Sequence, residues 1–459
     1  MIFAIKRYKT ILFLLILQLR LSGQENFIHR GYCGWIRDFS RTECNDAWPS
    51  IRIDSALLND YEETLDFLQR AGMNEITIWG LFTNKYWEPD VEKTIDAQRK
   101  ELVKLIIDKA HQRNLKLING MGVYSWGFDK ILEQRPGLGC PCNPHVMDLS
   151  NPESWEWQKK VIDYTMDNFD FDGVSMQSAD LGRCTCGQSQ QLSDMEYHAI
   201  VNQKAVSYIR SKNPNYIIGI SGWGMNFGDP SDLKYIQQMT QNVDYLIDVG
   251  ESVLNSGRQY RQKLIKTIAP CSYGNTAVPN IEPIQAMPRD LYFIPTVYHT
   301  CQRLIDIYKD GGMASDAYAR TRGNPGDKAT IEAVARILTN PETDITTALR
   351  ETLEVIYKPV NKNVLSELVS IYREAEDAFF SNYPGSDKDL IEVMPRGQAT
   401  PESNYFMIME PSSKKAYVQA INSLYTRVME LSGEVENGHE LELLKQCFTN
   451  ILHQINLSE

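Results

Sequence analysis

The sequence predicts a (β/α)8 TIM barrel followed by a C-terminal helical region. Short apolar runs of strand length alternate with amphipathic helical patterns through about residue 300. Because these runs are apolar on both faces, they are typical of parallel strands covered by helices. The length of 459 residues fits one barrel of roughly 250–300 residues with an appendage. We therefore expect the barrel over residues 24–326 and the helical region over residues 327–459.

The first residues have the pattern of an export signal. Lys6, Arg7 and Lys9 precede an apolar core over residues 11–19, and small residues up to Gly23 supply a cleavage site. The apolar core is too short to span a bilayer comfortably, and no later stretch is long and apolar enough to do so. We expect residues 1–23 to be a signal peptide and the mature protein to be exported, with no membrane span.

The charge of the chain excludes one class of partner. The formal net charge is −12, and removal of residues 1–23, which carry four basic residues and no acidic one, makes it more negative. A nucleic-acid-binding protein needs a basic face to neutralise phosphates, so we expect no nucleic-acid partner.

The barrel elements can be assigned in order from apolar runs and helix boundaries. An N-cap pattern at Asp54-Ser55 starts a helix that Ala71-Gly72 ends, and Asn151-Pro152 starts another. The expected helices of the barrel include residues 55–70, 94–113, a segment from residue 151, and 193–212. The expected strands cover residues 30–37, 73–79, 115–118, 173–177, 216–224, 243–249, 264–268 and 291–296.

The strand pattern stops before the last third of the chain. Periodic apolar stripes there predict helices, and proline-containing segments such as Asn340-Pro341 and Lys358-Pro359 separate them. The expected helices cover residues 328–338, 344–357, 364–380, 412–431 and 440–455. We interpret the stripes as core rather than as a cofactor site, and we expect no cofactor.

Polar and aromatic residues follow the ends of several expected strands. The carboxyl ends of barrel strands meet at one face, where barrel enzymes carry their active sites. Aromatic rings stack on sugar rings, whereas amides and carboxylates bind hydroxyl groups, so this mixture favours a carbohydrate. The predicted substrate-binding residues are Trp79, Asn119, Trp126, Gln177, Arg183, Trp223, Asp248, Tyr298 and His299.

Two carboxylates are the predicted catalytic pair, since glycoside cleavage usually needs one on each side of the scissile bond. Asp180 follows the strand of residues 173–177, and Glu251 follows the strand of residues 243–249. Arg183, close to Asp180 in sequence, is expected to hold that carboxylate ionised or to clamp a substrate carboxylate. Glu75 lies inside a strand and is expected to be structural.

Nine cysteines include two closely spaced pairs, Cys140 with Cys142 and Cys184 with Cys186. Four thiols in two pairs are able to bind zinc. The spacing is tighter than in usual zinc knuckles, and export favours oxidation. We therefore expect a disulfide between the two pairs in preference to a metal.

Two stretches resemble a known family. One comprises Cys142-Asn-Pro, Asn151-Pro, and the run from Trp155 through Phe171-Asp-Gly-Val-Ser-Met-Gln-Ser-Ala-Asp180 to Cys184-Thr-Cys186. It resembles the barrel core of exported glycoside-hydrolase-like proteins of bacterial polysaccharide-degradation systems. The other comprises Leu338-Thr-Asn-Pro-Glu-Thr-Asp-Ile345, Tyr357-Lys-Pro359 and Tyr372-Arg-Glu-Ala-Glu-Asp-Ala-Phe379. It resembles the helical region after the barrels of α-glucuronidases and certain endo-acting hexosaminidases.

The resemblance implies an acid at the position of Asp180. Many relatives carry Glu, or an Asp-Glu pair, at this position, whereas here the neighbours are Ala179 and Leu181. We predict a glycoside hydrolase acting on a polysaccharide or a glycan-derived oligosaccharide. The alternative is a non-catalytic carbohydrate-binding barrel of a glycan-uptake system. A third option, a lyase or esterase acting on uronic-acid glycans, depends on Arg183 alone.

Overall fold

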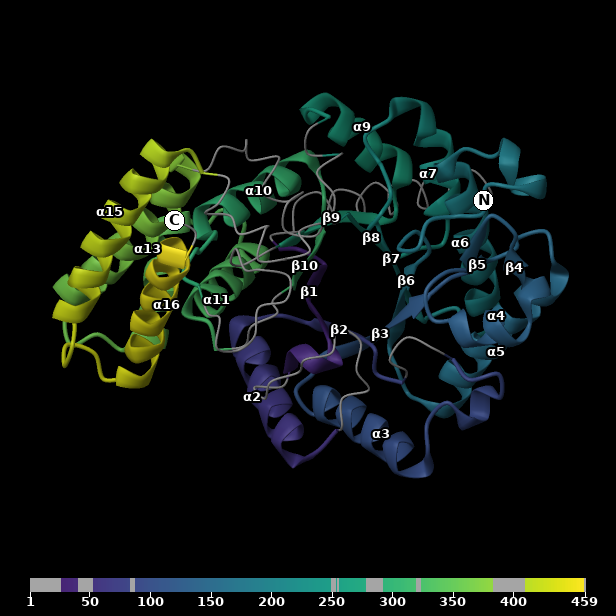
Figure 1. Cartoon of the computed structure of the whole chain (residues 1–459), viewed down its shortest axis with the longest axis horizontal. Coiled ribbons are helices and arrows are strands. Elements are labelled where there is room, and N and C mark those ends of the chain that lie inside the picture. The colour runs from purple at the N-terminus through teal and green to yellow at the C-terminus, as the bar shows by residue number, and fades with distance from the viewer. Residues whose placement is uncertain are drawn as a thin grey trace, which may run out of the picture.

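The chain forms a closed barrel of parallel strands, as the sequence predicts. The computed structural model describes residues 26–39, 53–82, 87–248, 253, 256–277, 292–318, 323–382 and 409–457. Within them, the strands follow one another around the barrel in chain order, and Figure 1 looks onto the ring that they form. They are β1 (His29–Trp35), β2 (Glu75–Trp79), β3 (Lys116–Gly122), β6 (Gly173–Gln177), β7 (Ile217–Ser221), β8 (Tyr245–Asp248), β9 (Ser272–Ala277) and β10 (Ala314–Tyr318).

Helices surround the barrel and continue beyond it. Those before the last barrel strand are α2 (Ser55–Ala71), α3 (Ala97–His111), α4 (Asp129–Gln134), α5 (Pro152–Asn168), α6 (Asp194–Lys212), α7 (Leu233–Met239), α9 (Arg258–Ile268) and α10 (Val297–Asp310). Those after it are α11 (Pro325–Thr339), α12 (Ile345–Tyr357), α13 (Lys362–Asn382), α15 (Pro411–Glu430) and α16 (Gly438–Leu457). Among the described helices, none combines the length and apolar character needed to cross a membrane.

The helix boundaries follow local sequence chemistry. Asp54 caps α2 by accepting the backbone N–H of Leu57 at 3.0 Å. Gly72 ends the same helix in the left-handed conformation, with φ of +90°, which glycine adopts without strain. Asn151 caps α5, and its proline neighbour occupies the first helical position. These caps confirm the predicted starts of both helices.

Glycines inside the barrel make room for large side chains. A Cβ on Gly120 of β3 would lie 2.2 Å from the Trp79 ring, and one on Gly219 of β7 would lie 2.3 Å from the Tyr245 ring. Both rings therefore rest directly on a neighbouring strand. This close packing fills the interior of the barrel, as is usual for the fold.

Two predicted strands are wrong and two real ones were missed. Residues 264–268 end helix α9, in which Tyr260, Leu264 and Ile268 bury one face at four-residue spacing. Residues 292–296, the described part of the other predicted strand, lie outside the named strands. The last two strands of the barrel are instead β9 and β10, which lie further along the chain. The predicted signal peptide, residues 1–23, lies outside the described residues, and the predicted boundary between residues 326 and 327 stays a prediction.

The C-terminal helices are joined to the barrel by a buried carboxylate. Glu376 of α13 accepts the backbone N–H groups of Tyr298 (3.0 Å) and His299 (2.8 Å) at the first turn of α10. Burial raises the pKa of Glu376 to about 8, although these backbone hydrogen bonds oppose the shift. In Figure 1, helices α13, α15 and α16 lie together beside the barrel, on the side away from α4 and α5.

Candidate functional site

β6 ends at Gln177, whose buried amide is hydrogen-bonded through both of its polar atoms. Its Oε1 accepts the backbone N–H groups of Ala179 (2.8 Å) and Asp180 (3.0 Å). Its Nε2 donates to the carbonyl oxygen of Trp223, in the loop after β7, at 2.9 Å. Gln177 was predicted to bind substrate, whereas its amide joins two loops at the barrel mouth.

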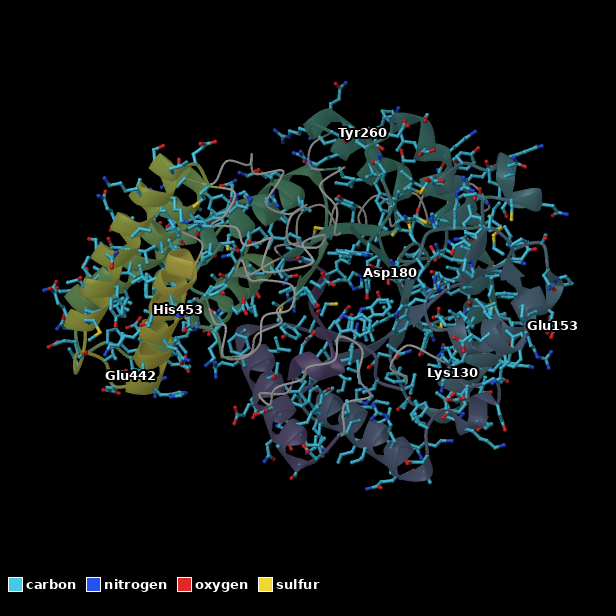
Figure 2. The ribbon with its side chains drawn as sticks, in the orientation of Figure 1. Lys130, Glu153, Asp180, Tyr260, Glu442 and His453 are labelled. Carbon is cyan, nitrogen blue, oxygen red and sulfur yellow. A yellow bond between two sulfur atoms is a disulfide. The ribbon has the colours of Figure 1, made fainter. Side chains whose placement is uncertain are left out.

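Asp180 is exposed at this mouth and contacts the neighbouring loop. The indole Nε1–H of Trp223 donates to Asp180 Oδ1 at 3.0 Å. In Figure 2, Asp180 lies within the ring of strands, inside the surrounding layer of helices. Gly224, with φ of +79°, brings the Trp223 loop so close that a Cβ there would lie 3.0 Å from the Ala179 carbonyl oxygen. The structure thus brings together three predicted site residues: Gln177, Asp180 and Trp223.

A buried polar layer supports the Asp180 loop from behind. Ser178 Oγ lies 3.0 Å from His198 Nδ1, and Asn202 Nδ2 donates to the same hydroxyl at 2.9 Å. Burial lowers the pKa of His198 from 6.5 to about 4, so its imidazole is neutral near pH 7. Neither His198 nor Asn202 stood out in the sequence, because a polar residue within an amphipathic helix is usually a surface residue.

Aromatic residues occupy the mouth at the β1–β3 side. The Trp35 and Trp126 ring centroids are 5.5 Å apart, and Trp79 lies 6.0 Å from Trp35 and 5.9 Å from Trp126. Trp79 is 9% exposed and Trp126 5% exposed, whereas Trp35 is half-buried. Trp79 and Trp126 were predicted to bind substrate, and in this structure most of their surface is used in packing.

Arg183 binds its own loop and Asp194, and not Asp180 as predicted. Its Nε donates to Asp194 at 2.5 Å, and its terminal nitrogens donate to the carbonyl oxygens of Cys184 (2.9 Å), Ser189 (3.2 Å) and Leu192 (3.0 Å). The guanidinium therefore fixes the loop that leads into α6. The predicted partnership with Asp180 and the predicted substrate clamp are corrected accordingly, because these hydrogen bonds already occupy most of its donors.

Tyr298 and His299 belong to a helix rather than to a strand end. Besides donating their backbone N–H groups to Glu376, they pack with the C-terminal helices: the His299 ring stacks on Phe380 with centroids 4.7 Å apart. The Tyr298 hydroxyl donates to Thr346 at 3.3 Å. Their predicted place at the end of a strand over residues 291–296 is therefore wrong.

The remaining predicted residues are placed only in part. Asn119 is buried. Because successive strand residues face opposite sides and Gly120 faces the barrel interior beneath Trp79, Asn119 points to the helix layer. Asn119 was predicted to bind substrate, and this orientation points its side chain away from the barrel interior. Asp248 ends β8, paired with Asn275, but its side chain lies outside the described part. Glu251 also lies outside the described residues, so the predicted carboxylate pair stays a prediction.

The structure adds an acid that the sequence did not reveal. In β10, Asp316 pairs with Gly31, and a Cβ on Gly31 would meet its Cβ at 3.2 Å. Asp316 thus shares the barrel interior with Cys33, whose thiol pKa is raised by burial and then by this carboxylate. Glu75, expected to be structural, is buried, with its Oε1 2.7 Å from His29 Nδ1.

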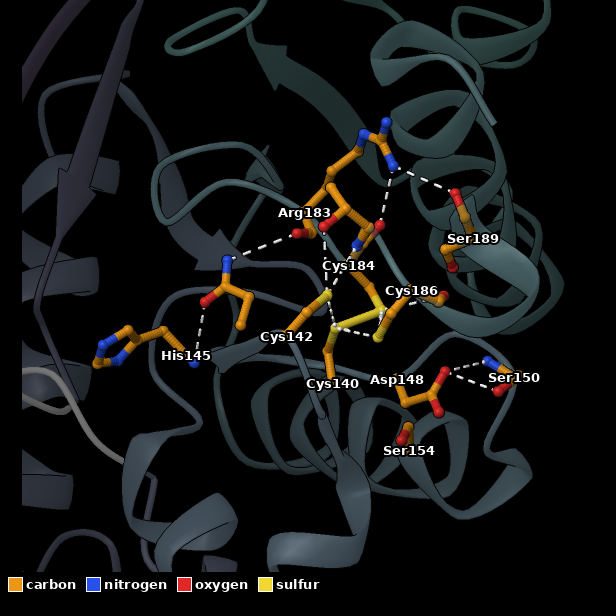
Figure 3. Close-up of a disulfide and its surroundings, with 12 residues drawn as sticks. Cys140, Cys142, His145, Asp148, Ser150, Ser154, Arg183, Cys184, Cys186 and Ser189 are labelled. Atoms are coloured by element: carbon orange, nitrogen blue, oxygen red, sulfur yellow. Dashed lines mark hydrogen bonds between the residues drawn. A yellow bond between two sulfur atoms is a disulfide. The ribbon is translucent and has the colours of Figure 1, made fainter. Parts of the chain in front are cut away.

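The loop that carries Asp180 is cross-linked to a small hairpin. The hairpin consists of β4 (Gly139–Cys140) and β5 (Asn143–Met147), which pair antiparallel. A disulfide joins Cys140 to Cys184, as Figure 3 shows, and confirms the expected bridge between the two cysteine pairs. The other member of each pair, Cys142 or Cys186, is not disulfide-bonded.

Comparisons with known proteins relate this fold to glycoside hydrolases. No protein-family model matches the chain, and no curated protein matches it. Its structure is similar to that of a GH138 enzyme targeting pectin rhamnogalacturonan II, with a TM-score of 0.60 and 10% identity over 96% of this chain and 73% of that chain. It is also similar to a mutant of the Thermobaculum terrenum O-GlcNAc hydrolase, with a TM-score of 0.53 and 11% identity over 93% of this chain and 82% of that chain. At these identities the likeness shows a glycosidase-like fold.

Proposed function

We propose that the protein is an exported glycoside hydrolase that cleaves a polysaccharide or a glycan-derived oligosaccharide at the mouth of its barrel. The observation that carries the proposal is the exposed Asp180 carboxylate, fixed through Gln177 and Trp223 inside the ring of strands. Barrel enzymes carry their chemistry at this end of the strands. The likeness of the fold to two glycoside hydrolases supports the same class of reaction.

Asp180 is the proposed acid/base. Its backbone N–H is held by Gln177, and one carboxylate oxygen accepts the Trp223 indole N–H, so the group has a defined position. A carboxyl group so placed transfers a proton to or from the glycosidic oxygen only when a substrate atom comes within hydrogen-bond reach. The exposure of Asp180 permits this approach.

The second carboxylate is proposed to be Glu251, with Asp316 as the other candidate. Glu251 follows β8, whereas Asp316 lies inside the barrel on β10. The separation of the two carboxyl groups decides the stereochemistry, because about 5–5.5 Å fits retention and about 6.5–9.5 Å fits inversion.

Aromatic surfaces at the mouth are proposed to bind the sugar rings. Trp223 is half-buried beside Asp180, and Trp35 is half-buried on the opposite side of the mouth. Amphipathic aromatic rings present an apolar face together with a polar edge, which suits the faces and hydroxyl rims of sugars. Trp79 and Trp126 support Trp35 from within the barrel.

The test is product release from a panel of plant, algal and host glycans by the mature protein and by the variant Asp180→Asn. A matched control is Asp170→Asn, since Asp170 is an exposed aspartate that precedes β6 at the opposite end of the barrel. Release by the wild type and the control, lost in Asp180→Asn, is the expected result. Release that survives in Asp180→Asn would move the catalytic acid elsewhere. Binding by calorimetry without release would instead indicate a non-catalytic carbohydrate-binding barrel.

A further inference from the structure

Four clustered cysteines have no role in the proposed hydrolysis. Cys140 and Cys142 lie at the turn between β4 and β5, and Cys184 and Cys186 lie in the loop that follows Asp180 (Figure 3). All four Sγ atoms lie within 4.8 Å of one another. Cys140 Sγ is 3.1 Å from Cys142 Sγ and 3.4 Å from Cys186 Sγ, and Cys184 Sγ is 3.7 Å from Cys186 Sγ. Two loops therefore bring four sulfur ligands to one point.

We propose that these four sulfurs, once the Cys140–Cys184 disulfide is reduced, bind one zinc-type divalent ion as a tetrathiolate site. Zinc–sulfur bonds of about 2.3 Å in a tetrahedron place the sulfurs about 3.8 Å apart. The distances of 3.1, 3.4 and 3.7 Å lie below this edge length by at most about 0.7 Å, and reduction of the disulfide frees Cys140 and Cys184 to separate to it. Four thiolates select a soft ion such as Zn²⁺ over Mg²⁺ or Ca²⁺.

Neighbouring groups are placed to stabilise thiolates at this site. The backbone N–H of Thr185 donates to Cys142 Sγ at 3.3 Å, and the Thr185 hydroxyl lies 3.2 Å from the same sulfur. Arg183, which is paired with Asp194, donates to the carbonyl oxygen of Cys184 at 2.9 Å and so fixes the loop that carries two of the sulfurs. A tetrathiolate with a divalent ion has a net charge of −2, and the two Thr185 donors stabilise part of that charge at Cys142.

Reduction of the Cys140–Cys184 disulfide needs an external reductant. A phosphine gives two electrons to the Cys140–Cys184 bond, water supplies the two thiol protons, and the oxygen of that water leaves as phosphine oxide. Binding of the ion by the four thiols then releases four protons to the buffer. The disulfide and the metal site are alternative states of one cluster. In either state the Asp180 loop stays tied to the β4–β5 hairpin, so the inference stands whether or not the proposed hydrolysis is correct.

The test is an anaerobic titration of the phosphine-reduced mature protein with Co²⁺, followed by competition with Zn²⁺. The expected result is one Co²⁺ per chain, with thiolate-to-cobalt charge-transfer bands and the d–d spectrum of tetrahedral cobalt, displaced by Zn²⁺. The oxidised protein should bind none, because two ligands are then held in the disulfide. Zinc should also raise the Tm of the reduced protein, since a ligand that binds only the folded state stabilises it.

Single substitutions distinguish this site from adventitious binding. Cys142→Ser and Cys186→Ser should lose the charge-transfer bands and the stoichiometric binding, while Cys301→Ala, in α10 on the other side of the barrel, should keep both. Cys142 is exposed, so its serine variant should fold, which circular dichroism can check. Absence of stoichiometric binding to the reduced, folded wild type would overturn the proposal. So would binding that persists in both serine variants or in the oxidised protein.

Discussion

The two sides of the barrel mouth are built by different physical means. On the β6–β7 side, hydrogen bonds fix each group: Gln177 joins two loops, and Trp223 donates to Asp180. On the β1–β3 side, three indoles pack against one another, and Trp79 rests on the backbone at Gly120. Aromatic residues are present on both sides, so their type alone does not show which side carries the chemistry.

This difference implies different responses to substitution. On the polar side, removal of one group leaves buried donors or acceptors without partners. The buried, neutral imidazole of His198 also makes stability depend on pH. On the aromatic side, the sensitive feature is volume, since one added methyl group has no space. Substitutions on the two sides test this contrast.

The largest effect on stability is expected for Gln177→Ala. It deprives two backbone N–H groups and the Trp223 carbonyl oxygen of their partner, which should lower the free energy of unfolding by about 4 kcal/mol. Urea denaturation measures the change. The matched control is Gln190→Ala, an exposed glutamine, for which little change is expected. Equal effects of the two substitutions would show that Gln177 does not organise the loops.

A pH-dependent effect is expected at His198. Because its pKa is lowered from 6.5 to about 4, the unfolded chain takes up a proton between these pH values that the folded chain does not. Its contribution is therefore fully present above pH 6.5 and is lost as the pH falls towards 4, by about 3 kcal/mol in total.

The variant His198→Gln should show a shallower fall in stability than the wild type between pH 7 and pH 4. Parallel denaturation series at several pH values give the comparison. The control is His453→Gln in α16, which removes an exposed histidine instead of a buried one. Identical profiles for wild type and His198→Gln would contradict a neutral buried imidazole.

On the aromatic side, Gly120→Ala should lower the free energy of unfolding by about 2 kcal/mol, because overpacking displaces Trp79. Gly137→Ala is the control, since no atom lies within 4 Å of its added Cβ. Denaturation with tryptophan fluorescence measures both stability and the environment of the indoles. A neutral Gly120→Ala would mean that the ring packing at the mouth is loose.

The smallest effect is expected for Trp223→Phe, which keeps an aromatic face but removes the N–H that Asp180 accepts at 3.0 Å. Loss of this exposed hydrogen bond should lower kcat/KM by about fivefold, equivalent to about 1 kcal/mol. Trp155→Phe, on α5 outside the barrel, serves as the control. Unchanged kinetics in both variants would show that the Trp223 N–H does not help to position Asp180.

The sequence predicted the fold class because most barrel strands are apolar runs. β6 was predicted at its observed bounds, since Gly173–Gln177 ends in a polar cluster. β10 was missed because Ala314, Ser315 and Asp316 have little strand propensity, and pairing with β1 and β9 forms this strand. Asp316 was missed for the same reason.

The candidate site could be predicted only in part, because its contacts are not local. Asp180 and Trp223 each follow a predicted strand, but their hydrogen bond joins residues 43 positions apart. The sequence shows which residue types stand at strand ends, whereas tertiary packing decides their partners. Arg183 illustrates this: it is close to Asp180 in the chain, yet it donates to Asp194.

The most direct test of the central claim is the dependence of the Asp180→Asn defect on the leaving group. An aryl glycoside of the cleaved sugar releases a phenolate that needs no protonation, whereas the natural glycan needs an acid. For the unactivated glycan, the variant should lose about 10³-fold in kcat, and for the aryl glycoside no more than about tenfold. Equal losses on both substrates would contradict acid catalysis by Asp180 and assign it to substrate binding.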